Sequence, residues 1–440
     1  MMRAITALLV LFLITACSES SPNSTSQTDI SLPIPQRSLV GTDLNLDSAA
    51  LYDKVLGALV GSAIGDAMGA STEMWHRADI QREYGYITGL TTVDLPRQAE
   101  GPWGNLLDAG ATTDDTRWKY FMGKYFTRHA GALNPDHFAG TIVDYYQDQV
   151  KALGNEQLAT NPDLLDDGVQ KVDWIKEWAR VALAYQEGGM ALERARNRFY
   201  GGEMSCAGML YTPMFGLISE NAEAAYKSGY DHALFDIGYA KDISGVVAAM
   251  TRLALQEDSI ELVLKQSLLI DPYGYTDSRL VGRLIQGIVD QSRQFVSSAY
   301  ELPEADTSTI DEVPRGFTGT QLDWLRQDYI YGELAKNQRA IAFHAGEIFQ
   351  ILYTALLYSE GDFEKAMAFI VNYGRDNDTV AAVAGMILGA QIGFDRLPVD
   401  LKSTALRVNR DLLGIDLEQI AREVMNTPLL SSEAMNDRLK

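Results

Sequence analysis

The chain has 440 residues, 46% of them apolar, and its 59 acidic and 37 basic residues give a formal net charge of −22. The apolar fraction is sufficient for a packed core and excludes a disordered or fibrous chain. The excess of acid argues against nucleic acid or an anionic membrane surface as a partner, because both favour Lys and Arg. With only 2 cysteines, a disulfide scaffold and a Cys-rich metal site are also excluded.

Residues 1–16 predict a signal for export. Arg3 precedes an apolar run that is too short to span a bilayer as a permanent helix. The run ends in Ile14-Thr15-Ala16-Cys17, which resembles the bacterial lipobox, and this resemblance implies cleavage before Cys17 and lipidation of its sulfur. Residues 17–50 then form a flexible tether. We expect an exported protein that is lipid-anchored to the bacterial cell envelope and touches the membrane only through Cys17; an ordinary cleaved signal is the alternative.

The rest of the chain has a helical pattern. Apolar residues recur at steps of three and four over 243–255, 260–270, 280–289 and 343–356, and alternating strand patterns are scarce. Loops are indicated at 154–167 and 301–320, but no linker divides the helical body. We therefore predict one large all-α domain over residues 51–430. Cys206 is expected to be a small core residue.

The first predicted helix carries Gly57, Gly61, Gly65 and Gly69, which are spaced by four and so form one stripe. Glycine inside a helix costs roughly 0.5–1 kcal/mol relative to alanine. Four on one face therefore indicate that another backbone, or a ligand, approaches closely. Asp66 lies beside this stripe and Glu73 just beyond the expected end of the helix.

A second motif, Thr113-Asp114-Asp115-Thr116, leads into an apolar helix. Acidic residues at a helix start interact favourably with the positive end of the macrodipole. Capping alone would account for this segment.

A third motif is Asp376-Asn377-Asp378-Thr379, followed by a helix rich in small residues. Residues two apart share a side of an extended backbone, so we expect Asp376 and Asp378 to point toward one place. An N-cap or half of a calcium loop are alternatives, although the other ligands of an EF-hand are missing.

Both acidic motifs contain two carboxylates and a hydroxyl. Four converging carboxylates without cations would raise one another's pKa. Oxygen ligands suit hard divalent cations, Mg²⁺ above all, or Mn²⁺. Two such cations roughly 3.5–4 Å apart would neutralise the cluster and provide a bimetallic hydrolytic site.

In their order and at their distance, the three motifs resemble the ADP-ribosylglycohydrolase family. The resemblance implies an all-α fold with a binuclear Mg²⁺ centre in a cleft. It also implies six metal ligands, carried over by position: Thr113, Asp114, Asp115, Asp376, Asp378 and Thr379. Glu73 falls where the family carries an acidic residue near the metals and the substrate.

Hydrolysis at a ribosyl carbon passes through an oxocarbenium-like state. A carboxylate near the metals would accept or deliver the proton and contribute roughly 10²–10⁴-fold to the rate. Glu73 and Asp115 are the two candidates for this catalytic role. The expected substrate is a small molecule or an ADP-ribosylated compound, and nucleic acid is not expected as a partner.

The substrate half of the family pattern is altered. The loop that contains Ser205 and Gly208 lacks the Asn and Arg of relatives, and Lys241-Asp242 replaces a Thr/Ser-His pair. We assign Asp66, Ser205, Gly208 and Arg375 to substrate binding. Arg375 either reaches a substrate phosphate or pairs with Asp376, and we favour the pairing.

Three hypotheses for the function remain. The first is a Mg²⁺-dependent hydrolase of an ADP-ribosyl or related ribosyl bond. The second is a hydrolase of a different N- or O-glycoside, such as a nucleoside, on the same fold, and the third is a non-catalytic binding lipoprotein. The tryptophans, including Trp103 and Trp174, have apolar neighbours at helical spacing, so we assign them no binding role.

Overall fold

The computed structural model describes residues 33–39, 42–96, 98, 100–155, 158, 160–309 and 312–430. The described residues from Ile34 onward form one compact unit. The predicted export signal and Cys17 lie outside the described residues and stay predictions. None of the helices in the described ranges is long and apolar enough to cross a membrane.

The described residues form helices and no strand, which confirms the all-α prediction; the only strand-like pairings there are isolated bridges. The α-helices are α1 (Ser48–Gly69), α2 (Arg77–Glu83), α3 (Asp114–Arg128), α4 (Pro135–Ala152), α6 (Pro162–Glu187), α7 (Gly189–Tyr200), α8 (Ala222–His232), α9 (Ala240–Ala254), α10 (Ile260–Ser267), α11 (Leu284–Tyr300), α12 (Gln321–Lys336), α13 (Ala345–Ser359), α14 (Phe363–Tyr373), α15 (Asn377–Ile392), α16 (Val399–Asp411) and α17 (Leu417–Asn426). Short 3₁₀ helices are η1 (Ala207–Leu210), η2 (Thr212–Ile218), η3 (Tyr275–Asp277) and η4 (Glu304–Thr309).

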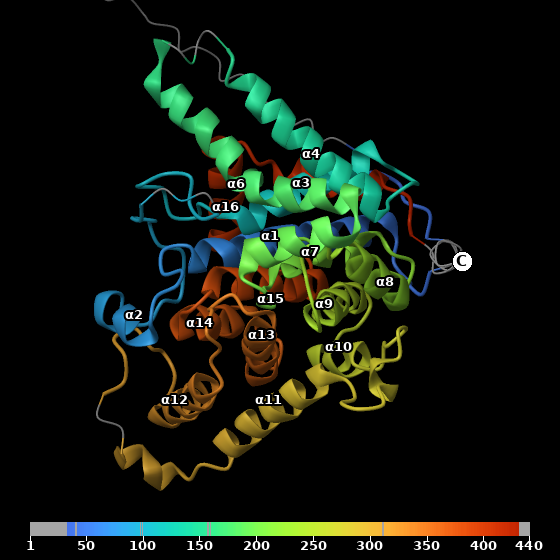
Figure 1. Cartoon of the computed structure of the whole chain (residues 1–440). Helices are drawn as coiled ribbons and strands as arrows, with labels where there is room; N and C mark the ends of the chain where they lie inside the picture. The colour runs from blue at the N-terminus through green and yellow to red at the C-terminus, as the bar shows by residue number, and fades with distance from the viewer. Residues whose placement is uncertain are drawn as a thin grey trace, which may run out of the picture. The chain divides into compact units, whose positions relative to one another are not determined.

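Helices α1 and α15 pack side by side at the centre of this unit (Figure 1). A Cβ atom added to Gly61 would overlap the carbonyl oxygen of Gly385, and one added to Gly57 would overlap the backbone at Gly389. The two backbones thus touch along the glycine stripe, which confirms that another backbone approaches it closely. Helices α3, α9, α13, α14, α16 and α17 pack around this central pair.

Two predicted loops differ from the structure. Helix α6 begins at Pro162, inside the predicted loop 154–167, because Asn161 caps it and proline is favourable in the first turn. The predicted loop 301–320 contains η4 and ends at Thr320, the N-cap of α12.

Residues at the end of the predicted tether pack onto the helical unit. Arg37 is buried, and its guanidinium donates hydrogen bonds to the carbonyl groups of Leu217, Val424 and Thr427. These contacts connect the segment 33–39 to η2 and to the end of α17.

Candidate metal centre

Glu73 and Asp376 are brought together by a short pairing of two distant segments. The backbone N–H of Met74 donates to the carbonyl oxygen of Arg375 at 2.7 Å, and the N–H of Arg375 donates to that of Trp75 at 2.9 Å. This pairing fixes the segment after α1 against the segment before α15. As a result, the carboxyl groups of Glu73 and Asp376 lie on the same cavity.

Glu73, Asp376 and Asp378, which we call the acidic cluster, each place one carboxylate oxygen within 4.8 Å of the others. Atoms Glu73 Oε2 and Asp378 Oδ1 are buried and have no hydrogen-bond partner in the described part of the chain. Unpaired buried carboxylate oxygens are costly unless they bind a cation or a proton. The cluster therefore has the oxygen ligands, two of them without a partner, that a hard divalent cation requires.

The expectation of an extended backbone across the third motif is wrong, although Asp376 and Asp378 do converge. Asp376 is the N-cap residue of α15 and Asp378 belongs to its first turn. The small residues of α15 begin directly after this turn and allow the close approach to α1, so the helix starts earlier than the polar sequence suggested.

The second motif meets the third through two threonine hydroxyls. Thr113 Oγ1 donates to Asp378 Oδ2 at 3.2 Å, and Thr379 Oγ1 donates to Asp115 Oδ2 at 2.9 Å. The other oxygen of Asp115 binds Lys119 Nζ at 3.1 Å, and both side chains are only 1% exposed. Asp115 therefore has a partner at each oxygen.

Asp66 lies beneath the centre rather than on its cavity. Its Oδ1 accepts from the backbone N–H of Thr113, and its Oδ2 accepts from the N–H and the hydroxyl of Thr116, at 2.6–2.9 Å. The carboxylate holds the first turn of α3, as an acidic group is expected to do at the positive end of a helix. Both oxygens of Asp66 thus have partners within the chain, and its assignment to substrate binding stays a prediction.

Burial, followed by mutual repulsion, raises the pKa of the acids at this centre. The pKa of Glu73 is raised to about 8, and those of Asp66 and Asp376 to about 6. Burial also raises the pKa values of Asp114 and Asp378 well above the usual range. A bound cation would oppose both causes by stabilising the charged form of each group.

The acidic cluster lies on a cavity of about 90 Å³, which we call the metal-centre cavity. Asp114, Thr379 and Glu100 also line it on the acidic side. The opposite wall carries the aromatic and apolar residues Trp178, Tyr200, Leu210 and Phe343, together with Met74, Ser205, Cys206 and Ala207. None of the described residues that line this cavity is Lys, Arg or His.

Of the residues predicted to bind substrate, Ser205 lines the cavity and Gly208 does not. The N–H of Gly208 donates to Asp236 Oδ1 at 2.9 Å, and Ser244 Oγ donates to Asp236 Oδ2 at 2.5 Å. A Cβ atom on Gly208 would overlap the side chains of Ser244 and Asp236. Gly208 therefore permits the packing that shapes the loop, and the loop presents Ser205 and Cys206 to the cavity.

The predicted pairing of Arg375 with Asp376 is wrong. The guanidinium donates to both carboxylate oxygens of Glu347, at 2.7 and 3.0 Å, and to the carbonyl oxygen of Arg339. The side chain of Glu347 is only 3% exposed, and a carboxylate buried to this extent requires a cationic partner. Arg375 therefore pairs with Glu347 rather than with Asp376. Arg375 is not among the described residues that line the metal-centre cavity, and its assignment to substrate binding stays a prediction.

Several residues of the site were missed or misjudged from the sequence. Lys119 could have been found, because it lies four residues after Asp115 on the same helix. Cys206 is a buried free cysteine as predicted, but it also lines the cavity, and its thiol lies 3.6 Å from Asp376 Oδ2. Phe343 reaches the wall through a bridge between Ser205 and His344, which no local pattern indicates.

The altered pair at the start of α9 has a structural explanation. Asp242 accepts two hydrogen bonds from Arg283, at 2.7 and 2.9 Å, and a third from the hydroxyl of Tyr226. Asp242 and Arg283 are almost completely buried. This ion pair connects α9 to α11, away from the metal-centre cavity.

The protein is thus all-α in its described residues, and the starts of α3 and α15 place carboxylates and hydroxyls beside one cavity. Such an acidic centre is of the kind that binds cations. A family model described as ADP-ribosylglycohydrolase matches residues 47–433. This chain belongs to the ADP-ribosylglycohydrolase family. The family generally binds divalent metals, in agreement with the acidic cluster.

Individual relatives are distant. The chain is 30% identical over 93 residues to the uncharacterized protein YegU of Escherichia coli K12, and this match covers 21% of the chain and 27% of YegU. It is 33% identical over 75 residues to the ADP-ribosyl-[dinitrogen reductase] glycohydrolase of Rhodospirillum rubrum, covering 17% of the chain and 22% of that protein. The matches thus span about a quarter of each relative. A solved structure titled ADP-ribosylglycohydrolase-related protein complex has the same fold, with a TM-score of 0.50, 19% identity, and coverage of 87% of this chain and 100% of that one.

Proposed function

We propose that this protein hydrolyses an ADP-ribosyl or related ribosyl glycosidic bond and depends on Mg²⁺, or Mn²⁺, held as a binuclear centre. The observation that carries this proposal is the convergence of Glu73, Asp376 and Asp378 on one cavity, with Glu73 Oε2 and Asp378 Oδ1 buried and unpaired. Membership of the family and the name of the Rhodospirillum rubrum relative support the class of substrate.

The residues present fit such a centre. Of the six predicted ligands, Asp114, Asp376, Asp378 and Thr379 line the cavity and would supply oxygen ligands. Thr113 and Asp115 instead join the two segments by hydrogen bonds to Asp378 and Thr379. A divalent cation bound there supplies a Lewis acid that polarises oxygen atoms and orients the sugar. The chain itself supplies an apolar wall of Trp178, Tyr200 and Phe343 opposite these ligands, against which a sugar would lie.

Of the two candidates for moving the proton, Glu73 is favoured over Asp115. Glu73 lines the cavity and has an unpaired Oε2, whereas both oxygens of Asp115 are engaged by Lys119 and Thr379. A group that transfers a proton must lie within hydrogen-bond reach of the reacting atom. Glu73 would therefore hold or accept the proton at the leaving group, while Asp115 positions the two acidic segments.

The uncharged wall favours a second candidate, the hydrolysis of a neutral N- or O-glycoside such as a nucleoside. A diphosphate is usually bound by Arg, Lys or helix N-termini. The described lining of the metal-centre cavity offers no basic side chain, and Arg375 is turned toward Glu347. An aromatic wall suits a base or a sugar ring without charge.

The test is hydrolysis by the purified protein of ADP-ribosyl-arginine, ADP-ribosyl-serine and simple nucleosides, each with Mg²⁺, Mn²⁺ or EDTA. Release of ADP-ribose in the metal samples supports the first candidate, and release of a free base only from nucleosides supports the second. Asp378→Asn is expected to lower the rate at least about 10²-fold. The exposed acid Glu364 gives the matched control Glu364→Gln, which should keep the full rate. Hydrolysis that is equal in EDTA, or none with any substrate from a folded protein, would contradict the proposal.

A further inference from the structure

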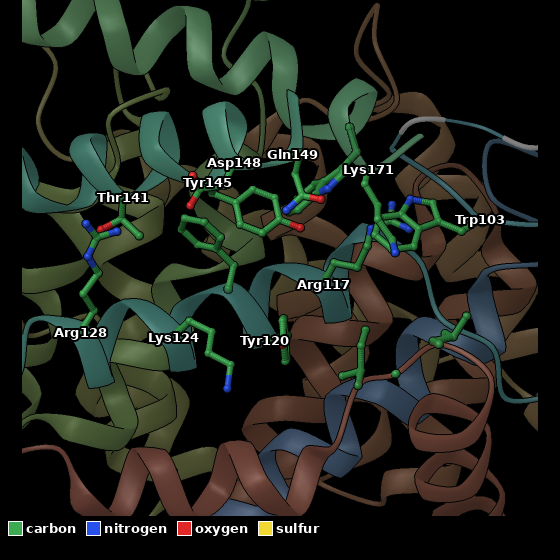
Figure 2. Close-up of a pocket in the computed structure, with 15 residues that line it drawn as sticks. Trp103, Arg117, Tyr120, Lys124, Arg128, Thr141, Tyr145, Asp148, Gln149 and Lys171 are labelled. Atoms are coloured by element: carbon green, nitrogen blue, oxygen red, sulfur yellow. The ribbon is translucent and has the colours of Figure 1, made fainter. Parts of the chain in front are cut away.

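A second cavity lies against α3, and it shares no lining residue with the metal-centre cavity. Its volume is about 470 Å³, within the range of roughly 300–1,000 Å³ that is typical of small-molecule sites. Figure 2 shows the labelled side chains of α4 and α6 on one side, facing those of α3 on the other. The segment 413–415, between α16 and α17, completes the wall.

The wall of this cavity, which we call the aromatic–cation pocket, combines two kinds of side chain. The aromatic residues are Trp103, Tyr120, Phe121, Tyr145 and Trp174, and the cations are Arg117, Lys124, Arg128 and Lys171. Asp148 is the only acid among the described lining residues. In a chain with a net charge of −22, such a predominance of cations is opposite to the average of the sequence.

Carboxylates outside the wall offset part of this charge. Lys124 pairs with Glu423 at 2.7 Å, and Arg128 pairs with Asp144 at 2.5 Å. Asp148 is itself paired with a cation outside the wall, at 3.1 Å. Lys171 is exposed and forms no ion pair within the described residues, so its charge is available to a ligand.

Arg117 is held rigidly at the inner end. Its guanidinium lies 4.1 Å from the centroid of the Trp103 ring and 5.5 Å from that of Trp174, and its Nη2 donates to the carbonyl oxygen of Gly101. Tyr145 belongs to α4 and also lines this pocket. Figure 2 shows it across the pocket from Tyr120 of α3. Fixed aromatic faces bind flat rings at little entropic cost. Trp103 and Trp174, to which the sequence assigned no binding role, therefore line a cavity.

We propose that the aromatic–cation pocket binds a small anion that carries a flat ring, of the nucleoside monophosphate class. The ring lies on the aromatic side chains, and the phosphate is bound at the mouth by Lys171. The pocket is large enough for one nucleotide. This proposal does not rest on hydrolysis at the metal centre, because the two cavities have separate walls.

The test is calorimetric titration with AMP, adenosine and inorganic phosphate in EDTA, on the full chain and on Asp378→Asn. We expect AMP to bind both proteins equally and each of its two halves to bind at least about tenfold more weakly. Lys171→Glu should weaken AMP binding about fivefold, and Trp103→Ala about tenfold. The control is Lys336→Glu, which makes the same change of charge at an exposed position on α12. Lys336 does not line the pocket, so this variant should leave AMP binding within about twofold of the natural protein.

Three results would overturn the proposal. The first is the absence of AMP binding at millimolar concentration to the folded protein. The second is binding that requires metal or is lost in Asp378→Asn, which would assign the nucleotide to the metal-centre cavity. The third is binding that Lys336→Glu weakens as much as Lys171→Glu does, which would indicate a general effect of charge. Asp378→Asn is expected to remove hydrolysis but to keep the binding of AMP. The failure of AMP binding is therefore distinguishable from the failure of the proposed hydrolase activity.

Discussion

The buried carboxylate of Asp236 holds the loop that forms one wall of the metal-centre cavity. Burial raises its pKa to about 6 from a usual 3.8, although the hydrogen bonds from Ser244 and Gly208 lower it in part. A raised pKa in the folded state means that folding favours the protonated carboxyl. Its contribution to stability is therefore fully present below about pH 3.8 and is lost as the pH rises through about 6.

Asp236→Asn removes this titration. Between pH 4 and pH 7, we expect the free energy of unfolding of the natural protein to fall by about 2 kcal/mol relative to that of the variant, because most of the effect of a pKa raised from 3.8 to about 6 falls in this range. Urea unfolding at several pH values measures the difference. Ser244→Ala removes a hydrogen bond that stabilises the charged carboxylate of Asp236. It should therefore raise the pKa of Asp236 and move the loss of stability to higher pH. A difference between Asp236→Asn and the natural protein that stays constant with pH would contradict the assignment.

Individual partners in the site were the hardest feature to predict. The types of the residues indicated an acidic cluster, and the structure brings Glu73, Asp376 and Asp378 together; that the cluster binds a cation stays a prediction. The pairing of Arg375 with Glu347, and of Asp242 with Arg283, involves residues on different helices. Nothing near Arg375 in the sequence indicates that α13 starts next to it.

At the scale of the helices, the glycine stripe of α1 makes a sharp prediction. Gly61→Ala should destabilise the protein by at least about 2 kcal/mol, because its Cβ would overlap the backbone of Gly385 and neither helix can yield. Gly332→Ala is the matched control. This residue lies inside α12 with open space around it, so alanine should stabilise by roughly 0.5–1 kcal/mol. Urea unfolding measures both, and equal stabilities of the two variants would contradict the close packing of α1 against α15.

Helix boundaries show where sequence reasoning loses precision. The predicted loop 301–320 ends where α12 begins, because its glycines and prolines marked the loop; the capping box of Thr320 and Asp323 was not predicted. The start of α15 was expected later in the chain, because its N-cap residue, Asp376, makes no capping hydrogen bond with its side chain and lies in a polar run that also suits an extended loop. Capping and metal binding use the same residue types, so composition alone does not separate them.

For the whole molecule, metal binding and stability should be coupled. At a concentration of 100 times its Kd, Mg²⁺ or Mn²⁺ is expected to raise the free energy of unfolding by roughly 2.7 kcal/mol. Protons compete for the same oxygens, and the pKa values of Asp376 and Glu73 are raised to about 6 and about 8. The stabilisation should therefore shrink as the pH falls from 8 to 6.

Thermal unfolding with and without EDTA measures this coupling. Asp378→Asn should abolish the effect of the metal, whereas Glu364→Gln should leave it unchanged. No shift for the natural protein at millimolar metal would show that the acidic cluster does not bind these cations.

The sequence of the whole chain was sufficient to predict two features, the class of the fold and the meeting of the distant acidic motifs. Helical periodicity indicated the first, and the ordered set of three motifs indicated the second. The cavity walls were not accessible, because they depend on how outer helices approach the central pair. The aromatic–cation pocket is the clearest case, since α3, α4, α6 and the segment 413–415 contribute to it from separate regions.

The contact between α1 and α15 limits how this protein can acquire a new substrate. At Gly69 the backbone of α1 reaches that of Asp378, so the base of the metal-centre cavity has no side chain that could be exchanged to enlarge it. The opposite wall is different, because Tyr200, Ser205 and Phe343 belong to the end of a helix and to loops. Libraries varied at that wall should therefore yield altered selectivity with the chemistry retained, whereas libraries varied along the glycine stripe should yield mostly unfolded protein.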